Sequence, residues 1–201
     1  AVRSRHPAYK VMNSYQQQFT PDDERYINDC ADIIASQSID LTEEKILDLL
    51  QITKRWQKGS IETINHSSYT SAEYFDCNNW LIYSEWKRLY DLGFTSHMID
   101  TLDLTKDLRE LNQKLYDIKG SSTVGNLYIT KGTNSRRVSF PLHNHEYLVI
   151  VKPIYGSCVW QVGNESSEYG PGDLIIIPPG MAHCVHESTE PRLSLTLNLT
   201  A

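Results

Sequence analysis

The pattern of hydrophobic and polar residues changes its period near Gly120. Before this glycine, apolar side chains recur every three or four residues, which is the spacing of an amphipathic helix. After it, apolar and polar side chains alternate, which is the spacing of a strand with one buried face. Because the helical segments precede the strands and do not alternate with them, the pattern predicts an α+β protein. We expect a helical region over residues 1–120, packed on one side of a β-barrel over residues 121–201.

Capping and stop signals divide the first region into four expected helices. Threonine followed by acidic residues is typical of a helix N-terminus, and glycine is typical of the residue that follows a helix. The helices are expected to begin near Thr20, Thr42, Ser71 and Ser96, and the last three to end near Gly59, Gly93 and Gly120. Residues 60–70 are rich in Ser, Thr and Asn and are expected to form a loop. The aromatic stripe of the third helix predicts core packing.

Seven strands are expected after Gly120, separated by turn residues. They are residues 124–130, 137–142, 145–152, 157–162, 173–177, 182–187 and 192–200. No internal repeat interrupts them, and strands of this number and length are enough to close a barrel. The last strand alternates polar residues with leucines, so one face must be core, and the other face is either exposed to solvent or lines a polar cavity.

Three histidines are spaced so that neighbouring strands could bring them together. His143 and His145 are two residues apart, and side chains with this spacing share one face of a strand. His183 begins a later strand, after a Pro-Pro-Gly turn. Neutral imidazole is a ligand suited to iron, zinc, nickel and copper. The sequence therefore predicts that these three histidines hold one divalent transition metal ion.

The same residues resemble the motifs of the cupin superfamily. The second cupin motif is matched by Gly172, Pro178, Gly180 and His183, and the first by His143, His145 and Gly156. Val149 stands where the first motif has a glutamate. The resemblance covers residues 121–201 and implies a cupin barrel, a double-stranded β-helix, whose three histidines bind the metal.

A second resemblance concerns the last strand. Arg192 lies nine residues after His183 and is followed, one residue on, by Ser194. This resembles the R-x-S element of the Fe(II) and 2-oxoglutarate-dependent oxygenases, and the run from Trp160 to Leu199 resembles their JmjC-like and aspartyl/asparaginyl hydroxylase-like branches. The resemblance implies Fe(II), with 2-oxoglutarate as a cosubstrate whose far carboxylate is bound by Arg192 and Ser194. An all-histidine ligand set is instead similar to that of the thiol and diketone dioxygenases, which are small cupins without 2-oxoglutarate.

Four further residues near the motifs are candidates for the site. Tyr147 shares the parity of His145 and is expected in the pocket, as a catalytic donor or as a wall. Lys152 is the alternative anchor for a cosubstrate carboxylate. His186 lies on the opposite face from His183 in a regular strand and is expected outside the ligand set. Glu187 shares the parity of His183, but the spacing does not identify it as a fourth ligand.

Composition limits the partners of the protein. The net charge is −6, and no concentrated basic run is present, so no nucleic-acid partner is expected. No apolar run approaches the roughly 20 residues of a membrane-spanning helix, so no membrane partner is expected. The four cysteines lack paired spacing, which favours a reducing, cytoplasmic location. A small-molecule or peptide substrate and a homodimer are the expected partners.

The three-histidine pattern and the two resemblances together imply a mononuclear non-haem Fe(II) oxygenase, in which 2-oxoglutarate drives hydroxylation of an amino acid, peptide or small metabolite. One alternative is a three-histidine cupin dioxygenase, or a metal-dependent cupin lyase or isomerase. Another alternative is a cupin that binds a small ligand without turnover. The sequence does not decide between them.

Overall fold

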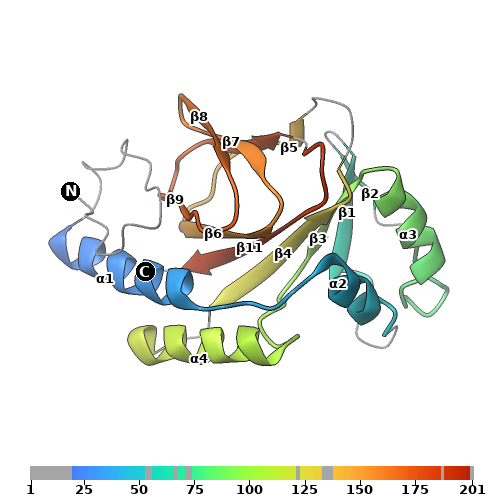
Figure 1. Ribbon diagram of the computed structural model, residues 1–201, viewed down its shortest axis with the longest axis horizontal. Helices are drawn as coiled ribbons and strands as arrows, with labels where there is room; N and C mark the ends of the chain where they lie inside the picture. The colour runs from blue at the N-terminus through green and yellow to red at the C-terminus, as the bar shows by residue number, and fades with distance from the viewer. Residues whose placement is uncertain are drawn as a thin grey trace.

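The computed structural model describes residues 20–52, 56–65, 68–70, 74–120, 123–132, 138–186 and 188–199. Its strands form two antiparallel sheets that face each other and enclose the barrel, while helices cover the outer side of the larger sheet (Figure 1). This arrangement confirms the predicted α+β class, with the helices on one side of the barrel.

The larger sheet has seven strands in the order β2-β1-β3-β4-β11-β6-β9, and the smaller has four in the order β5-β10-β7-β8. The strands of the larger sheet are β1 (Ile61–Asn65), β2 (Ser68–Thr70), β3 (Thr95–Met98), β4 (Val124–Thr130), β6 (Leu148–Tyr155), β9 (Ile175–Ile177) and β11 (Arg192–Leu199). Those of the smaller sheet are β5 (Val138–His143), β7 (Cys158–Val162), β8 (Glu165–Tyr169) and β10 (His183–His186). β3 pairs with β4, so the larger sheet continues across the boundary expected at residue 120.

The helices are α1 (Pro21–Ser36), α2 (Glu43–Leu50), α3 (Tyr83–Asp91) and α4 (Lys106–Lys119). The predicted starts of the first two are confirmed. The Thr20 hydroxyl accepts a hydrogen bond from the backbone N–H of Asp23, and the Asp23 carboxylate accepts one from the backbone N–H of Thr20, which is a capping box. Thr42 caps α2, and Gly120 ends α4 in the left-handed conformation.

Four predicted segments differ from the structure. The expected loop at residues 60–70 contains β1 and β2, and the helix expected from Ser96 is strand β3 followed by a turn, with α4 beginning ten residues later. Of the helix expected from Ser71 to Gly93, only the C-terminal half is helical, as α3, and α2 ends well before Gly59. Short apolar runs have the same composition in strands and in helices, so pairing with β4 decided what periodicity could not.

Two of the strand predictions also need correction. β6 begins at Leu148, so His145 lies in the loop between β5 and β6, not in a strand. β8 was not predicted, because four of its five residues are exposed and polar and show no alternation. It is an edge strand that pairs only with β7 among the described strands.

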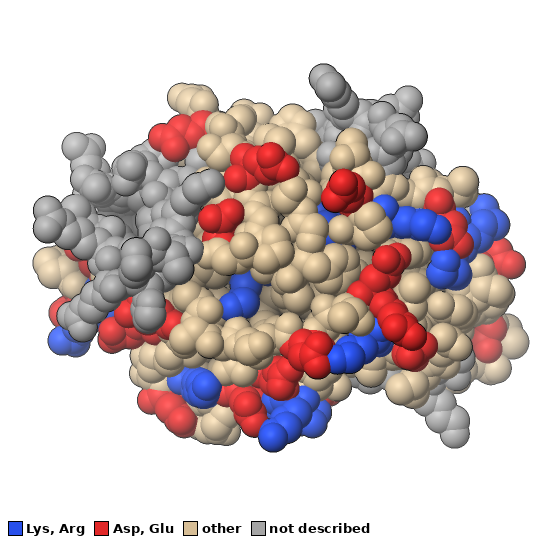
Figure 2. Space-filling model, viewed as in Figure 1, with Lys and Arg blue, Asp and Glu red and all other residues tan. Residues whose placement is uncertain are grey.

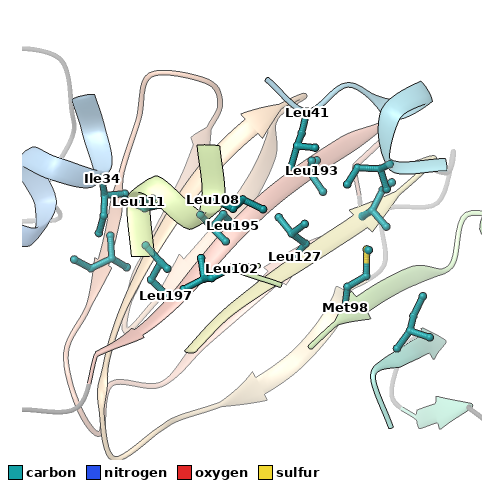
Figure 3. Close-up of a cluster of buried hydrophobic side chains, with 14 of the residues drawn as sticks. Ile34, Leu41, Met98, Leu102, Leu108, Leu111, Leu127, Leu193, Leu195 and Leu197 are labelled. Atoms are coloured by element: carbon teal, nitrogen blue, oxygen red, sulfur yellow. The ribbon is translucent and has the colours of Figure 1, made fainter. Parts of the chain in front are cut away.

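The two faces of β11 have different environments. Its leucines belong to the main hydrophobic core together with residues of α1, α2 and α4; Figure 3 shows Leu193 near Leu41 and Leu195 near Leu108. The opposite face carries Arg192, Ser194 and Thr196, which are only 2, 4 and 8% exposed. Their burial excludes the solvent-exposed alternative, so the polar face of the last strand lines the interior of the barrel.

The surface shows no separation of charge on the face seen in Figure 2, where acidic and basic side chains are interspersed. None of the helices in the described part of the chain is both long enough and apolar enough to cross a membrane.

Lys152 lies on the face of β6 that packs against the helices, where it pairs across the sheet with Leu195. Its Nζ donates hydrogen bonds to the backbone carbonyl oxygens of Ile34, Ala35 and Gln37, at 2.6, 3.1 and 2.9 Å. These groups belong to the C-terminal end of α1, where the helix dipole is negative. The expectation that Lys152 anchors a cosubstrate is therefore wrong, because the ammonium group caps a helix outside the barrel.

Lys152→Met is expected to lower the free energy of unfolding by about 2–4 kcal/mol, because a charged donor to three carbonyl oxygens is lost. Urea denaturation measures the change. Lys114→Met is the matched control, since within the described residues Lys114 donates to a single acceptor, the Gln37 side chain, and it should cost less than about 1 kcal/mol. Equal effects of the two substitutions would contradict the capping role of Lys152.

His97 lies on the inner face of β3, opposite Glu62 of β1 and Tyr128 of β4. Its ring stacks on Tyr128, with centroids 4.5 Å apart and planes 8° apart. Within the described chain, neither ring nitrogen has a hydrogen-bond partner, and the Glu62 carboxylate is 3.6 Å from Nδ1. Burial lowers the pKa of His97 to about 4, so the imidazole is neutral at pH 7.

The buried neutral state of His97 is expected to make the protein acid-sensitive. Its pKa of about 4 in the folded state lies below the ordinary 6.5, so the unfolded chain binds this proton first as pH falls. The associated stability is fully present above pH 6.5 and is lost as pH falls through 4, up to about 3 kcal/mol. His97→Phe keeps the ring contact and should flatten the pH dependence of urea stability in this window. An unchanged pH profile would contradict the assignment.

Candidate metal centre

The three histidines predicted as ligands converge at one end of the smaller sheet. His143 is the last residue of β5 and lies directly opposite His183, the first residue of β10, and His145 follows in the next loop. Their candidate ligand nitrogens all lie within 4.8 Å of one another. The ring centroids of His143 and His183 are 4.2 Å apart. The ring centroid of His145 is 4.8 Å from that of His143 and 5.2 Å from that of His183. Three imidazoles this close can bind a single metal ion.

Two of the rings are oriented by backbone carbonyl groups. Nδ1 of His143 is 2.7 Å from the carbonyl oxygen of Pro141, and Nδ1 of His183 is 3.0 Å from that of Met181. A carbonyl oxygen only accepts hydrogen bonds, so each Nδ1 carries the proton and donates it. This leaves the lone pair on Nε2, the nitrogen that would bind the metal.

The environment of His183 and His145 favours the neutral form of these two imidazoles. Burial lowers the pKa of His183 to about 4, although its bond to the Met181 carbonyl opposes the shift. Burial also lowers the pKa of His145, with a smaller contribution from His143. Only neutral imidazole binds a metal ion, so at pH 7 protons do not compete strongly with the metal for His145 and His183.

Two cupin-motif glycines hold the segments of the site together. The N–H of Gly180 donates to the carbonyl oxygen of His145 at 2.6 Å, which ties the turn before His183 to the loop that carries His145. Gly156 has φ 68°, and a Cβ at this position would lie 2.2 Å from the carbonyl oxygen of Pro191 and 2.8 Å from the Cα of Arg192. Only glycine permits this close approach, which sets the position of the first residue of β11.

The three histidines open into a small cavity inside the barrel. It is lined by Tyr128, His143, His145, Val149, Val151, Trp160, His183, Val185, Arg192, Ser194 and Thr196. The volume accessible to the centre of a water molecule in this cavity is about 30 Å³. Because one water molecule needs roughly 10–15 Å³ of such volume, the cavity has room for only a few. Within the described residues, the buried hydroxyl groups of Ser194 and Thr196 have no hydrogen-bond partner. The cavity is thus lined on one side by the three imidazoles and on another by hydroxyl groups without a hydrogen-bond partner in the described chain.

Several lining residues were not predicted from the sequence. Thr196 shares the parity of Arg192 along β11, which is a signal that could have identified it. Trp160 lies over His183, with ring centroids 6.4 Å apart, and Tyr128 comes from β4, the neighbour of β11. Aromatic residues in strands usually indicate core packing, so neither of these two carried a sequence signal for the site.

Among the expected site residues, Arg192 and Ser194 reach the cavity, but Tyr147 does not line it. The ring of Tyr147 instead stacks on His145, so the expectation that its hydroxyl faces the cavity as a catalytic donor is not supported. His186 is outside the histidine cluster, as expected. Among the described residues no carboxylate joins the cluster. Glu187 lies outside the described residues.

Comparison with known proteins identifies the fold of the barrel. Residues 128–197 match the AraC-like ligand binding domain family. The structure is similar to that of YcfD, a ribosomal oxygenase from Escherichia coli that was solved in complex with cobalt and succinic acid. The TM-score is 0.55 at 15% identity, and the match covers 83% of this chain and 46% of that chain. It is also similar to the DMSP lyase DddQ from Ruegeria pomeroyi DSS-3, with a TM-score of 0.35, 20% identity and coverage of 39% of this chain and 38% of that chain.

No curated protein matches the sequence. This chain spans less than half the length of either structure compared above. The fold is that of a cupin, which confirms the resemblance to the cupin superfamily inferred from the glycine, proline and histidine spacing.

Proposed function

We propose that this protein is a mononuclear non-haem Fe(II) oxygenase that uses 2-oxoglutarate to hydroxylate an amino acid, peptide or small metabolite. The observation that carries the proposal is one cavity that is lined both by the three histidines and by Arg192. A metal site and an anion site in the same enclosed space are the two elements that such a reaction needs.

The donor set fits a divalent transition metal. His143, His145 and His183 would each supply one nitrogen, and an ion held by three protein ligands keeps further positions for small ligands. When bound there, Fe(II) would supply the redox chemistry that activates O₂, while 2-oxoglutarate and the substrate would each supply two of the four electrons that O₂ accepts. Valine and tryptophan side chains on the cavity wall would limit the access of bulk water to such an ion.

The polar wall fits a carboxylate. A guanidinium group is planar and binds a carboxylate through two parallel hydrogen bonds. The hydroxyl groups of Ser194 and Thr196, on the same strand face as Arg192, can donate further hydrogen bonds to the anion. The neighbour YcfD was solved with succinic acid, a dicarboxylic acid, in addition to cobalt, which supports a dicarboxylate as the ligand of this cavity.

Anaerobic titration of 2-oxoglutarate into the Fe(II)-loaded protein tests the proposal. Chelation of Fe(II) by the 2-oxo acid through two oxygens is expected to produce a visible charge-transfer band. Succinate is the matched control, because it lacks the 2-oxo group and should bind without the band. Stoichiometric iron with no band at saturating 2-oxoglutarate would exclude the cosubstrate role.

A second candidate function is a three-histidine cupin dioxygenase without a cosubstrate. Two observations favour it: the ligand cluster in the described chain contains no carboxylate, and the cavity has room for only a few water molecules. With three neutral ligands the ion keeps its full charge, which favours an anionic substrate such as a thiolate. Iron binding without the 2-oxoglutarate band, together with a spectral change on adding a small thiol, would favour this candidate.

A further inference from the structure

The three metal-ligand candidates are not held in the same way. His143 and His183 each donate an Nδ1–H bond to the carbonyl oxygen two residues before them. No hydrogen bond of this kind holds the ring of His145 in the described chain. The backbone of His145 is fixed, because its carbonyl accepts from Gly180 at 2.6 Å. The orientation of its side chain therefore depends on another contact.

That contact is the ring of Tyr147. The two rings are nearly parallel, with centroids 4.8 Å apart and planes 12° apart. The other two imidazoles meet His145 at 78° and 50°, so neither supports its face. Tyr147 is itself packed against the barrel core formed by residues such as Val149, Ile177 and Val185. A ring anchored in this way can restrict the plane of the imidazole that lies on it.

We propose that Tyr147 is a positioning residue for the metal centre. Its ring holds the imidazole plane of His145 in the orientation for metal binding, as the two carbonyl groups do for His143 and His183. This inference rests on the proposed metal site. It assigns Tyr147 a role through its ring face, in place of the role of a catalytic donor through its hydroxyl.

Titration of the purified full chain with Co(II) tests this role, because the d–d absorption of Co(II) reports both affinity and coordination geometry. Tyr147→Phe keeps the ring and is expected to match the wild type within about two-fold, with the same spectrum. Tyr147→Leu and Tyr147→Met remove the ring and are expected to bind about ten-fold more weakly, with an altered spectrum, as for other groups that orient metal ligands. The two variants replace each other if one fails to fold.

Tyr169→Leu is the matched control for a purely structural effect. Tyr169 is a buried tyrosine of the same hydrophobic cluster, 2% exposed, and none of the ring contacts in the described chain joins it to a histidine. This variant should lower thermal stability and leave Co(II) affinity and spectrum unchanged.

Three results would overturn the inference. The first is wild-type affinity and spectrum in a folded Tyr147→Leu or Tyr147→Met variant. The second is a Tyr147→Phe variant as weak as these, which would assign the effect to the hydroxyl group. The third is equal weakening by Tyr169→Leu, which would assign it to packing. A wild-type protein that binds no Co(II) would instead reject the metal site itself, so the two failures are distinguishable.

Discussion

His183→Ala is expected to lower metal affinity by more than about 100-fold, since a ligand is lost outright where even groups that only orient ligands contribute 10–100-fold. His183 has the deepest burial of the three histidines, and its Nδ1–H bond to Met181 already orients Nε2. The stabilisation of the wild type by added Co(II) or Fe(II) should disappear in the variant, because a ligand that binds only the folded state raises the unfolding temperature. Isothermal titration calorimetry and thermal unfolding measure the two effects.

His186→Ala is the matched control, because it removes an imidazole from the same strand but not from the cluster. It should keep wild-type metal affinity. A loss of metal binding in both variants would mean that β10 as a whole, and not His183, is needed. A wild-type affinity in His183→Ala would contradict the three-histidine site.

Arg192→Ala is expected to weaken 2-oxoglutarate binding by about 2–5 kcal/mol while metal binding is kept, because a charge-assisted pair with the carboxylate is lost. Arg192 lines the cavity and is 2% exposed, so a pair that it forms there is weakly screened by solvent. The dependence of the charge-transfer band on 2-oxoglutarate concentration, in a titration of the Fe(II) protein, measures the affinity. Metal affinity should stay within a few-fold of the wild type, since the three histidines are untouched.

Lys152→Met serves as the control for this measurement under conditions where it remains folded. It removes a positive charge from the helix-facing side of β6, so its 2-oxoglutarate affinity should equal that of the wild type. An Arg192→Ala variant that binds 2-oxoglutarate as tightly as the wild type would reject the cosubstrate site. The three-histidine dioxygenase would then be the better interpretation of the same cavity.

The two faces of β11 show what the alternation of residues in a sequence predicts and what it does not. Strict alternation of leucine with polar residues requires one buried apolar face, and the structure confirms it. The pattern could not tell whether the polar face was inside or outside, because both environments accept arginine and serine. The opposing small sheet, whose strands all precede β11 in the chain, encloses that face.

The direction of Lys152 could have been obtained from the same kind of pattern. It is out of phase with Val149 and Val151, which face the cavity, so alternation along β6 places it on the helix side. What alternation could not show is its partner, since the carbonyl groups it caps lie 115 to 118 residues earlier in the chain.

The sequence by itself determined the features that a few neighbouring residues encode: the caps at Thr20 and Thr42, the alternation of the last strand, and the cupin spacing that carries the three histidines. Tertiary structure alone decided that β1 and β3 extend the larger sheet, that Tyr128 and Trp160 line the cavity, and that Tyr147 supports His145. Helix caps and residue periodicity depend on residues that are close together in the sequence. Strand pairing and side-chain contacts depend on segments that meet only when the barrel closes.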